Sequence, residues 1–103
     1  MVSRAEDTRG ILDAGSKTFT LDTGGLDGFG LILEHPTANI YKMAEEHGFL
    51  DVSNCETKPS VGDVLRVVPN HVCVVVNMFD QIVAVRDNTI VDILPVTARG
   101  RLV

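Results

Sequence analysis

The sequence contains no tryptophan, only four phenylalanines and one tyrosine, and only two cysteines, Cys55 and Cys73. It has no apolar run approaching the roughly 20 residues that a membrane span requires, and its first ten residues lack the apolar segment of a secretory signal. Without such a signal, the two thiols are expected to stay reduced. These features together predict a cytoplasmic protein with no membrane partner.

Positive charge is also scarce. Nine lysines and arginines stand against fourteen aspartates and glutamates, which gives a net charge of −5, and the basic residues are scattered along the chain. A nucleic-acid-binding surface needs a basic patch or stripe, so a nucleic-acid partner is not expected. The apolar content of 45% and the length of 103 residues instead predict one globular domain, residues 1–103, with a single core.

Short apolar runs separated by Gly, Pro and Asx turns dominate the chain and predict about seven short strands with little helix. The fold class is therefore mainly β, as a small closed or sandwich-like domain. Residues 1–9 are expected to fray and 95–103 to lie along the surface, and Glu34, His35 and Cys55 are interpreted as surface residues. The expected strands include residues 10–14, 17–20, 29–33, 64–68, 81–86 and 89–94, with 64–68 central in the sheet and a tight turn at 87–88.

The segment from Thr37 to Val52 permits two structures. Thr37 could cap a helix with Ile40 and Met43 on one side. Equally, residues 38–44 could form a strand that turns at Glu45-Glu46-His47-Gly48 and returns through Phe49. The local pattern leaves both open.

His71 and Cys73 stand out in the run Val61 to Asn77, VGDVLRVVPNHVCVVVN. In extended backbone the i, i+2 spacing places both side chains on the same side, and imidazole and thiolate are both good zinc ligands. A structural zinc site takes four ligands, however, and only one pair is visible. Cys73 could equally be a small core residue among its valine neighbours.

The glycine-rich stretch from Gly24 to Gly30 does not predict a phosphate-binding loop. No helical pattern follows it, and no Gly-Lys-Ser/Thr closes it. It is expected to be an ordinary loop.

Four segments carry a resemblance to a known family. The strings LDAGSKTF (12–19), AEEHGFL (44–50), VGDVLRVVPNHVCVVVN (61–77) and IVAVRDNTIVDILPVTARGR (82–101) are similar to the C-terminal domain of the D-serine dehydratase and D-threonine aldolase family. These are fold-type III, alanine racemase-like pyridoxal phosphate enzymes. The resemblance runs from about Arg9 to Arg101, and PNHVC at 69–73 is its most specific part.

The resemblance implies a metal-binding β-domain that packs against a TIM-barrel domain or chain carrying pyridoxal phosphate. His71 and Cys73 would bind zinc or another divalent metal beside that cofactor. In the dehydratase branch the pair is His-x-Cys, whereas the aldolase branch tends to place a carboxylate second, so Cys73 favours dehydration. The substrate would be a small D-β-hydroxy amino acid, and the complete enzyme could be a homodimer.

The family's barrel has no counterpart in these 103 residues, since a barrel takes typically ~250. None of the three lysines, Lys17, Lys42 and Lys58, lies in a Schiff-base motif, so the domain alone is expected to be inactive and to bind no pyridoxal phosphate. Glu46 and His47 could relay a proton if the hairpin tip faces the site, or could form an ordinary polar turn. A D-threonine aldolase-like lyase domain and a non-catalytic stand-alone binding module remain the alternatives.

Overall fold

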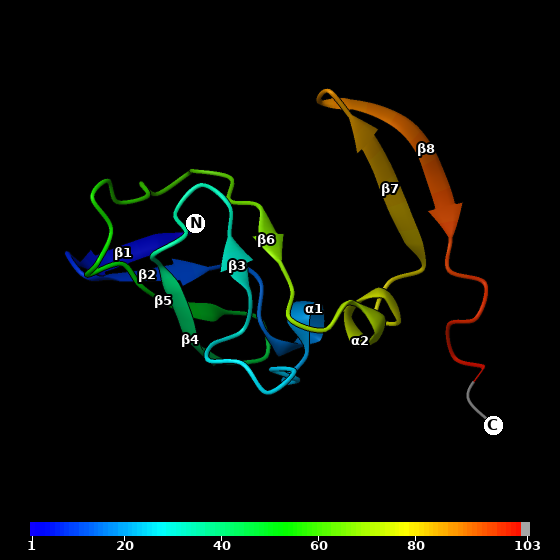
Figure 1. The fold of residues 1–103 in the computed structure, drawn as a ribbon, viewed down its shortest axis with the longest axis horizontal. Coiled ribbons are helices and arrows are strands. Elements are labelled where there is room, and N and C mark those ends of the chain that lie inside the picture. The colour runs from blue at the N-terminus through cyan, green and yellow to red at the C-terminus, as the bar shows by residue number, and fades with distance from the viewer. Residues whose placement is uncertain (102–103) are drawn as a thin grey trace.

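The structure, a computed structural model that describes residues 1–101, is built on a four-stranded antiparallel sheet in the order β1-β2-β5-β4 (Figure 1). Strands β1 (Ser3–Glu6) and β2 (Arg9–Leu12) form one hairpin, and β4 (Asn39–Met43) and β5 (Gly48–Asp51) form a second. The register between β2 and β5 places Gly10 opposite Leu50, so the two hairpins join at the centre of the sheet.

Two smaller sheets and two short helices complete the chain. Strand β3 (Leu31–Ile32) pairs with β6 (Val67–Val68) beside the main sheet. Helix α1 (Ser16–Phe19) follows β2, and helix α2 (Val72–Val76) leads into the hairpin of β7 (Gln81–Arg86) and β8 (Thr89–Pro95). Among the described residues, the structure contains no helix long and apolar enough to cross a membrane.

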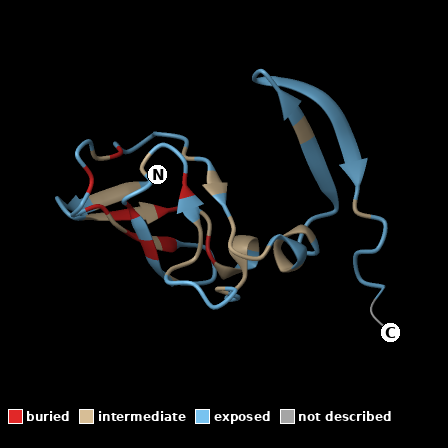
Figure 2. Ribbon diagram, viewed as in Figure 1, coloured by how far each residue is buried: buried red, intermediate tan, exposed pale blue. Residues whose placement is uncertain are grey.

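The core lies between the main sheet and the small β3-β6 sheet (Figure 2). Leu50 on β5 faces Ile40 on β4, and both are fully buried, as are Ile32 and Val52. Their neighbours on each strand alternate outward, as a half-buried sheet requires. The other core residues are Met1, Leu12, Ala38 and Cys55, with Phe29, Met43, Leu65 and Val67 packed against them.

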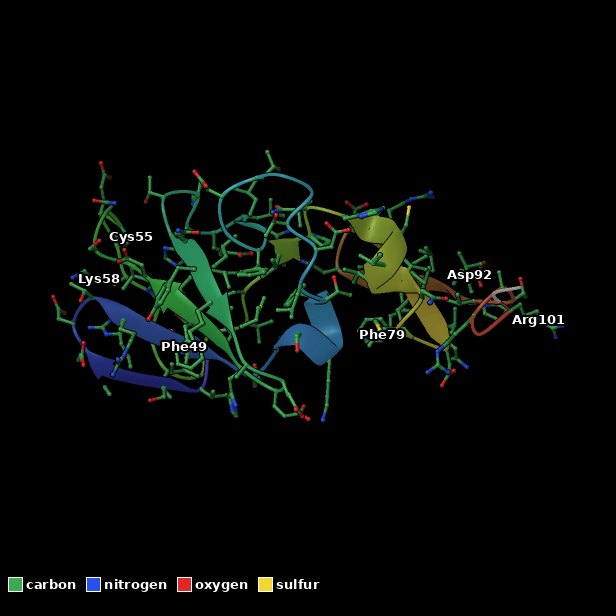
Figure 3. The ribbon with its side chains drawn as sticks, turned by 90° about the horizontal axis from the view of Figure 1, so that it is seen from below. Phe49, Cys55, Lys58, Phe79, Asp92 and Arg101 are labelled. Carbon is green, nitrogen blue, oxygen red and sulfur yellow. The ribbon has the colours of Figure 1, made fainter. Side chains whose placement is uncertain are left out.

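The β7-β8 hairpin stands apart from this core and is exposed along nearly its whole length (Figures 1 and 2). Figure 3 places Asp92 and Arg101 at the end of the molecule opposite Phe49 and Cys55. The hairpin nevertheless carries seven large apolar side chains with exposed surface: Ile82, Val83, Val85, Ile90, Val91, Ile93 and Leu94.

The predicted fold class, mainly β with little helix, is confirmed, with eight strands instead of about seven. Within residues 1–101 the strands form separate small sheets and do not close into a barrel. The strand alternative for 37–52 is correct, and the turn at 45–48 joins β4 to β5. The predicted strand at 81–86 and the tight turn at 87–88 are also confirmed, since Asp87 and Asn88 both have positive φ, as a type I′ turn requires.

The central strand predicted at 64–68 is wrong. Only Val67 and Val68 pair, with β3, and Val64 is 88% exposed. β-Branched residues suit the pleated surface of any strand, so they do not predict how many strands will pair with a segment. The rest of the chain decides that number.

The chain is helical in two segments predicted as extended, the largely polar residues 17–20 and the apolar run around Cys73. Residues 16–19 form α1, where Thr18 and Phe19 donate backbone hydrogen bonds to Gly15 O, and residues 72–76 form α2. Short apolar runs are ambiguous between strand and helix.

Two further expectations fail at the edges of the core. The start of the chain does not fray, because Met1 is buried and β1 pairs with β2. Of the predicted surface segment 95–103, residues 102–103 lie outside the described residues. Cys55 is a core residue and not a surface thiol, and Thr37 Oγ1 lies 3.6 Å from its Sγ. The polar residues on either side of Cys55 in the sequence led to the prediction of a surface position.

Candidate metal-binding site

His71 lies at the junction between the small β3-β6 sheet and α2. It is the residue that precedes α2, with extended backbone at φ −132° and ψ 97°, and its side chain is 42% exposed. Its Nδ1 lies 2.5 Å from Oδ2 of Asp22, 49 residues earlier in the chain. The ring is therefore oriented by a carboxylate from a distant loop.

The loop that carries Asp22 is tied to the same place by Asn70. The Asn70 side-chain amide donates to the carbonyls of Thr23 (2.9 Å) and Gly28 (3.0 Å). Within the loop, Gly24 N–H donates to the other oxygen of Asp22, Oδ1, at 2.8 Å. This backbone hydrogen bond, followed by the contact with His71, holds the pKa of Asp22 below its ordinary value, so the carboxylate stays ionised.

Glycine is required in this loop at Gly28. Its φ is +74°, and a Cβ there would lie 2.2 Å from Oδ1 of Asn39. Gly28 therefore permits the close packing of this loop against β4.

Cys73 lies in α2, two residues after His71, and its thiol is exposed. The predicted geometry for the pair is wrong in one respect, because the backbone is extended at His71 but helical at Cys73. The metal role of the two residues does not depend on that detail and stays a prediction. The interpretation of Cys73 as a buried core residue is wrong, since the thiol is not in the core.

A divalent ion is chemically compatible with these side chains. An exposed thiol and an imidazole whose other nitrogen is held by a carboxylate are the donor types that bind zinc, and the carboxylate–histidine pair is a recurrent arrangement behind such ligands. Within residues 1–101, however, no three His, Cys, Asp or Glu side chains gather as a metal site. An ion here would complete its coordination with water, substrate or another polypeptide.

The turn between β4 and β5 packs against the start of α1. Ser16 N–H and Lys17 N–H donate to the carbonyls of Ala44 and Glu45. Lys17 Nζ also lies 2.7 Å from Glu46 and 3.1 Å from Glu45, which lowers the pKa of Glu46. Glu46 is thereby engaged in a surface ion pair, and His47 is exposed beside it.

Helix α1 in turn lies next to α2, the helix of Cys73. Helix α1 therefore contacts both the turn at 45–48 and α2. A catalytic role for Glu46 and His47 stays a prediction.

The three lysines do not form a pyridoxal phosphate site. Besides Lys17, which pairs with the β4-β5 turn, Lys58 pairs with Asp7 at 2.6 Å and Lys42 lies 5.1 Å from the centroid of the Phe49 ring. All three are in surface contacts on the main-sheet side of the molecule. None of these surface contacts indicates a cofactor lysine, and the expectation that the chain alone binds no pyridoxal phosphate stays a prediction.

The family model described as "Putative serine dehydratase domain" matches residues 1–85. The chain belongs to this family. The match includes His71 and Cys73 and ends within β7, so most of the projecting hairpin lies beyond it. The predicted resemblance is thereby confirmed.

The curated relatives of this chain fall into two groups by length. An uncharacterized protein of Mycobacterium tuberculosis is 39% identical over 92 residues, which cover 88% of this chain and 69% of that protein. D-threonine aldolase of an Arthrobacter species is 37% identical over 97% of this chain, and 3-hydroxy-D-aspartate aldolase of Paracoccus denitrificans is 30% identical over 98%. The chain spans only about a quarter of these two aldolases, 25% and 24% of their lengths.

Solved structures show the same fold. D-threonine aldolase from Filomicrobium marinum superposes with a TM-score of 0.85 at 30% identity, over 99% of this chain and 27% of that one. D-threo-3-hydroxyaspartate dehydratase from Delftia sp. HT23 gives a TM-score of 0.74 at 22% identity, which shows the fold alone.

Sequence reasoning missed Asp22 and Asn70. The string Asp-Thr-Gly at 22–24 does signal that Asp22 folds back onto the N–H of Gly24. Nothing local indicates that its second oxygen meets an imidazole 49 residues away.

Proposed function

We propose that this chain is the metal-binding C-terminal domain of a pyridoxal phosphate-dependent lyase that acts on small D-β-hydroxy amino acids. The observation that carries the proposal is the contact of His71 Nδ1 with Asp22, and the exposed thiol of Cys73 lies two residues farther along the chain. His71 and Cys73 would hold a divalent ion, with zinc as the expected metal. When bound, such an ion supplies a Lewis acid for an oxygen of the substrate.

The share of the chain in its longer relatives supports the domain assignment. Since it spans about a quarter of the D-threonine aldolase and 3-hydroxy-D-aspartate aldolase, the other three quarters leave room for a barrel of ~250 residues. We assign the cofactor and its lysine to such a barrel, because none of the lysines of this chain lies in a Schiff-base motif.

The β7-β8 hairpin is the surface on which the barrel would dock. Val83 lies opposite Ile93 and Val85 opposite Ile90 on one face, while Ile82 lies opposite Leu94 on the other. An isolated two-stranded hairpin is only marginally stable in water, and exposed apolar patches mark interaction sites. The exposed apolar residues of the hairpin support a docking role over that of a self-sufficient module.

Dehydration and aldol cleavage are the two candidate reactions. Cys73 favours dehydration, because His71 and Cys73 together resemble the His-x-Cys pair of the dehydratase branch. The D-threonine aldolases and the 3-hydroxy-D-aspartate aldolase that match at 30% identity or more favour cleavage of the Cα–Cβ bond instead. Product analysis of the complete enzyme with D-serine and D-threonine distinguishes them: ammonia and a keto acid for dehydration, glycine and an aldehyde for cleavage.

A non-catalytic module is the candidate from another class. The mycobacterial relative favours the non-catalytic module. The 92 matched residues already make up 69% of that protein, which leaves no room for a barrel of ~250 residues. Pairing with a barrel on a separate polypeptide would reconcile that length with a lyase.

Calorimetric titration of the chain with zinc tests the metal assignment. Two ligands hold an ion less firmly than four, so we expect weak one-site binding that declines as pH falls and the ligands take up protons. His71→Ala and Cys73→Ala should each abolish it. His47→Ala is the matched histidine control and Cys55→Ala the cysteine control, and both should bind as the parent does; equal binding by all four variants would refute the assignment.

A further inference from the structure

We propose that Asp22 is a positioning residue that fixes the tautomer of His71, with the proton on Nδ1 and the lone pair on Nε2. The role of Nε2 as the metal-binding nitrogen rests on the proposed function; the tautomer itself does not. No site residue was expected in the loop that carries Asp22.

The first step of the argument is the position of one proton. Nδ1 of His71 and Oδ2 of Asp22 are 2.5 Å apart, a separation that two acceptor atoms reach only with a hydrogen between them. The other oxygen, Oδ1, accepts the Gly24 N–H, and in an aspartate that is ionised at neutral pH Oδ2 can also only accept. A carboxylate that only accepts hydrogen bonds requires the proton to be on Nδ1.

The second step is that both partners are held in place. Asn70, the residue before His71, bridges to the carbonyls of Thr23 and Gly28 on the two sides of the loop. Gly24 adopts φ +62°, and a Cβ there would be in van der Waals contact with Asn70. Residues 22–28 and the backbone of His71 are therefore held together, which keeps the His71 ring within reach of Asp22.

The third step is chemical. A neutral imidazole with its proton on Nδ1 presents Nε2 as its lone-pair nitrogen, and a carboxylate on the Nδ1 side makes that nitrogen more basic. Loss of such an outer partner typically costs ten- to hundredfold in metal affinity. Asp22 would thus act on a metal only through His71.

The tautomer can be measured without metal. Two-bond proton–nitrogen correlation spectra of the full-length, nitrogen-15-labelled chain, recorded at the alkaline limit where imidazoles are neutral, show which ring nitrogen is protonated. His71→Ala identifies the His71 signals among those of His35 and His47. We expect the Nδ1–H pattern in the parent; an Nε2–H pattern or an even mixture would overturn the proposal, whatever any variant does.

Asp22→Asn removes the charge but keeps an oxygen for the Gly24 N–H. The His71 pattern should then shift toward Nε2–H, and zinc or cobalt affinity should fall ten- to hundredfold. Asp27→Asn, in the same loop and exposed, is the matched control and should change neither. An unchanged tautomer in Asp22→Asn, or an unchanged metal affinity, would contradict a positioning role.

The two proposals fail separately. If the parent shows Nδ1–H, responds to Asp22→Asn and yet binds no zinc, the tautomer assignment stands and the proposed metal function falls. If zinc binds but His71 is the Nε2–H tautomer, the metal site stands and the role of Asp22 falls.

Discussion

At the scale of single residues, Glu34 is the carboxylate that the fold perturbs most clearly. Its two oxygens accept hydrogen bonds from Arg66, at 2.6 Å from the guanidinium Nε and 2.9 Å from the backbone N–H. These bonds lower the pKa of Glu34 from 4.5 to about 2, with the side-chain bond as the larger cause. The pair also reinforces the Leu33 N–H to Arg66 carbonyl bond beside β3 and β6.

This shift predicts an acid-dependent contribution to stability. Because the folded-state pKa lies below the unfolded value, the pair stabilises the fold above about pH 4.5, and that contribution is lost as pH falls toward about 2. Glu34→Gln should lower the melting temperature at pH 7 and flatten its decline across this range. The effect should be small, since Arg66 is largely exposed.

Melting temperatures measured from pH 7 to pH 2 check this. Glu56→Gln, which changes an exposed glutamate in the loop after β5, is the control and should follow the parent at every pH. A Glu34→Gln curve parallel to that of the parent would show that the contact with Arg66 does not persist in solution.

At the scale of elements, β5 carries the fold because it pairs on both sides. Leu50 lies opposite Gly10 of β2 and Ile40 of β4 and is completely buried. Leu50→Ala should therefore lower the free energy of unfolding by about 2–5 kcal/mol. Val64→Ala, at a position predicted from sequence to be a strand but 88% exposed, should change it by less than about 0.5 kcal/mol.

Urea denaturation of the two variants measures both values. Equal destabilisation would mean that 64–68 packs in solution as the central strand that the sequence pattern predicted. An unchanged free energy of unfolding in Leu50→Ala would instead mean that Leu50 is not part of the core in solution.

The β7-β8 hairpin should behave as a separate element. Its six register pairs are held by the turn at Asp87-Asn88 but cover no core, so its amides should exchange with solvent far faster than those of β5. Hydrogen exchange followed by mass spectrometry distinguishes peptides from the two regions. Protection of the hairpin equal to that of β5, at a concentration where the chain is monomeric, would contradict an unpartnered hairpin.

At the scale of the whole molecule, the chain is extended, 44 × 32 × 21 Å, with its core at one end and its apolar hairpin at the other. The region of His71 and Cys73 lies between them, at α2 (Figure 1).

The complete reaction is accordingly expected to require a second domain. The purified chain should release neither ammonia from D-serine nor glycine from D-threonine, because none of its lysines lies in a Schiff-base motif. Borohydride reduction in the presence of the cofactor, followed by mass spectrometry, should show no specific lysine adduct. Turnover by the chain alone, or one stoichiometric adduct on a single lysine, would refute this division of labour between two domains.

Much of the candidate site and some of the fold could be predicted from the sequence. Alternation and turn chemistry determined β7, β8 and the turn at 87–88, because type I′ geometry depends on the two turn residues themselves. The donor chemistry of His71 and Cys73 is likewise a property of the side chains, and it made the pair a candidate ligand set.

Tertiary structure decided what depends on contacts distant in sequence. The segment 37–52 became a hairpin because β5 pairs with β2, about 40 residues earlier. Residues 64 and 65 failed to become a strand because, among the described residues, no strand pairs with them. Cys55 was buried by the packing of the loop after β5. The partnership of Asp22 with His71 required the fold to bring together residues 49 positions apart, and no local pattern encodes such a contact.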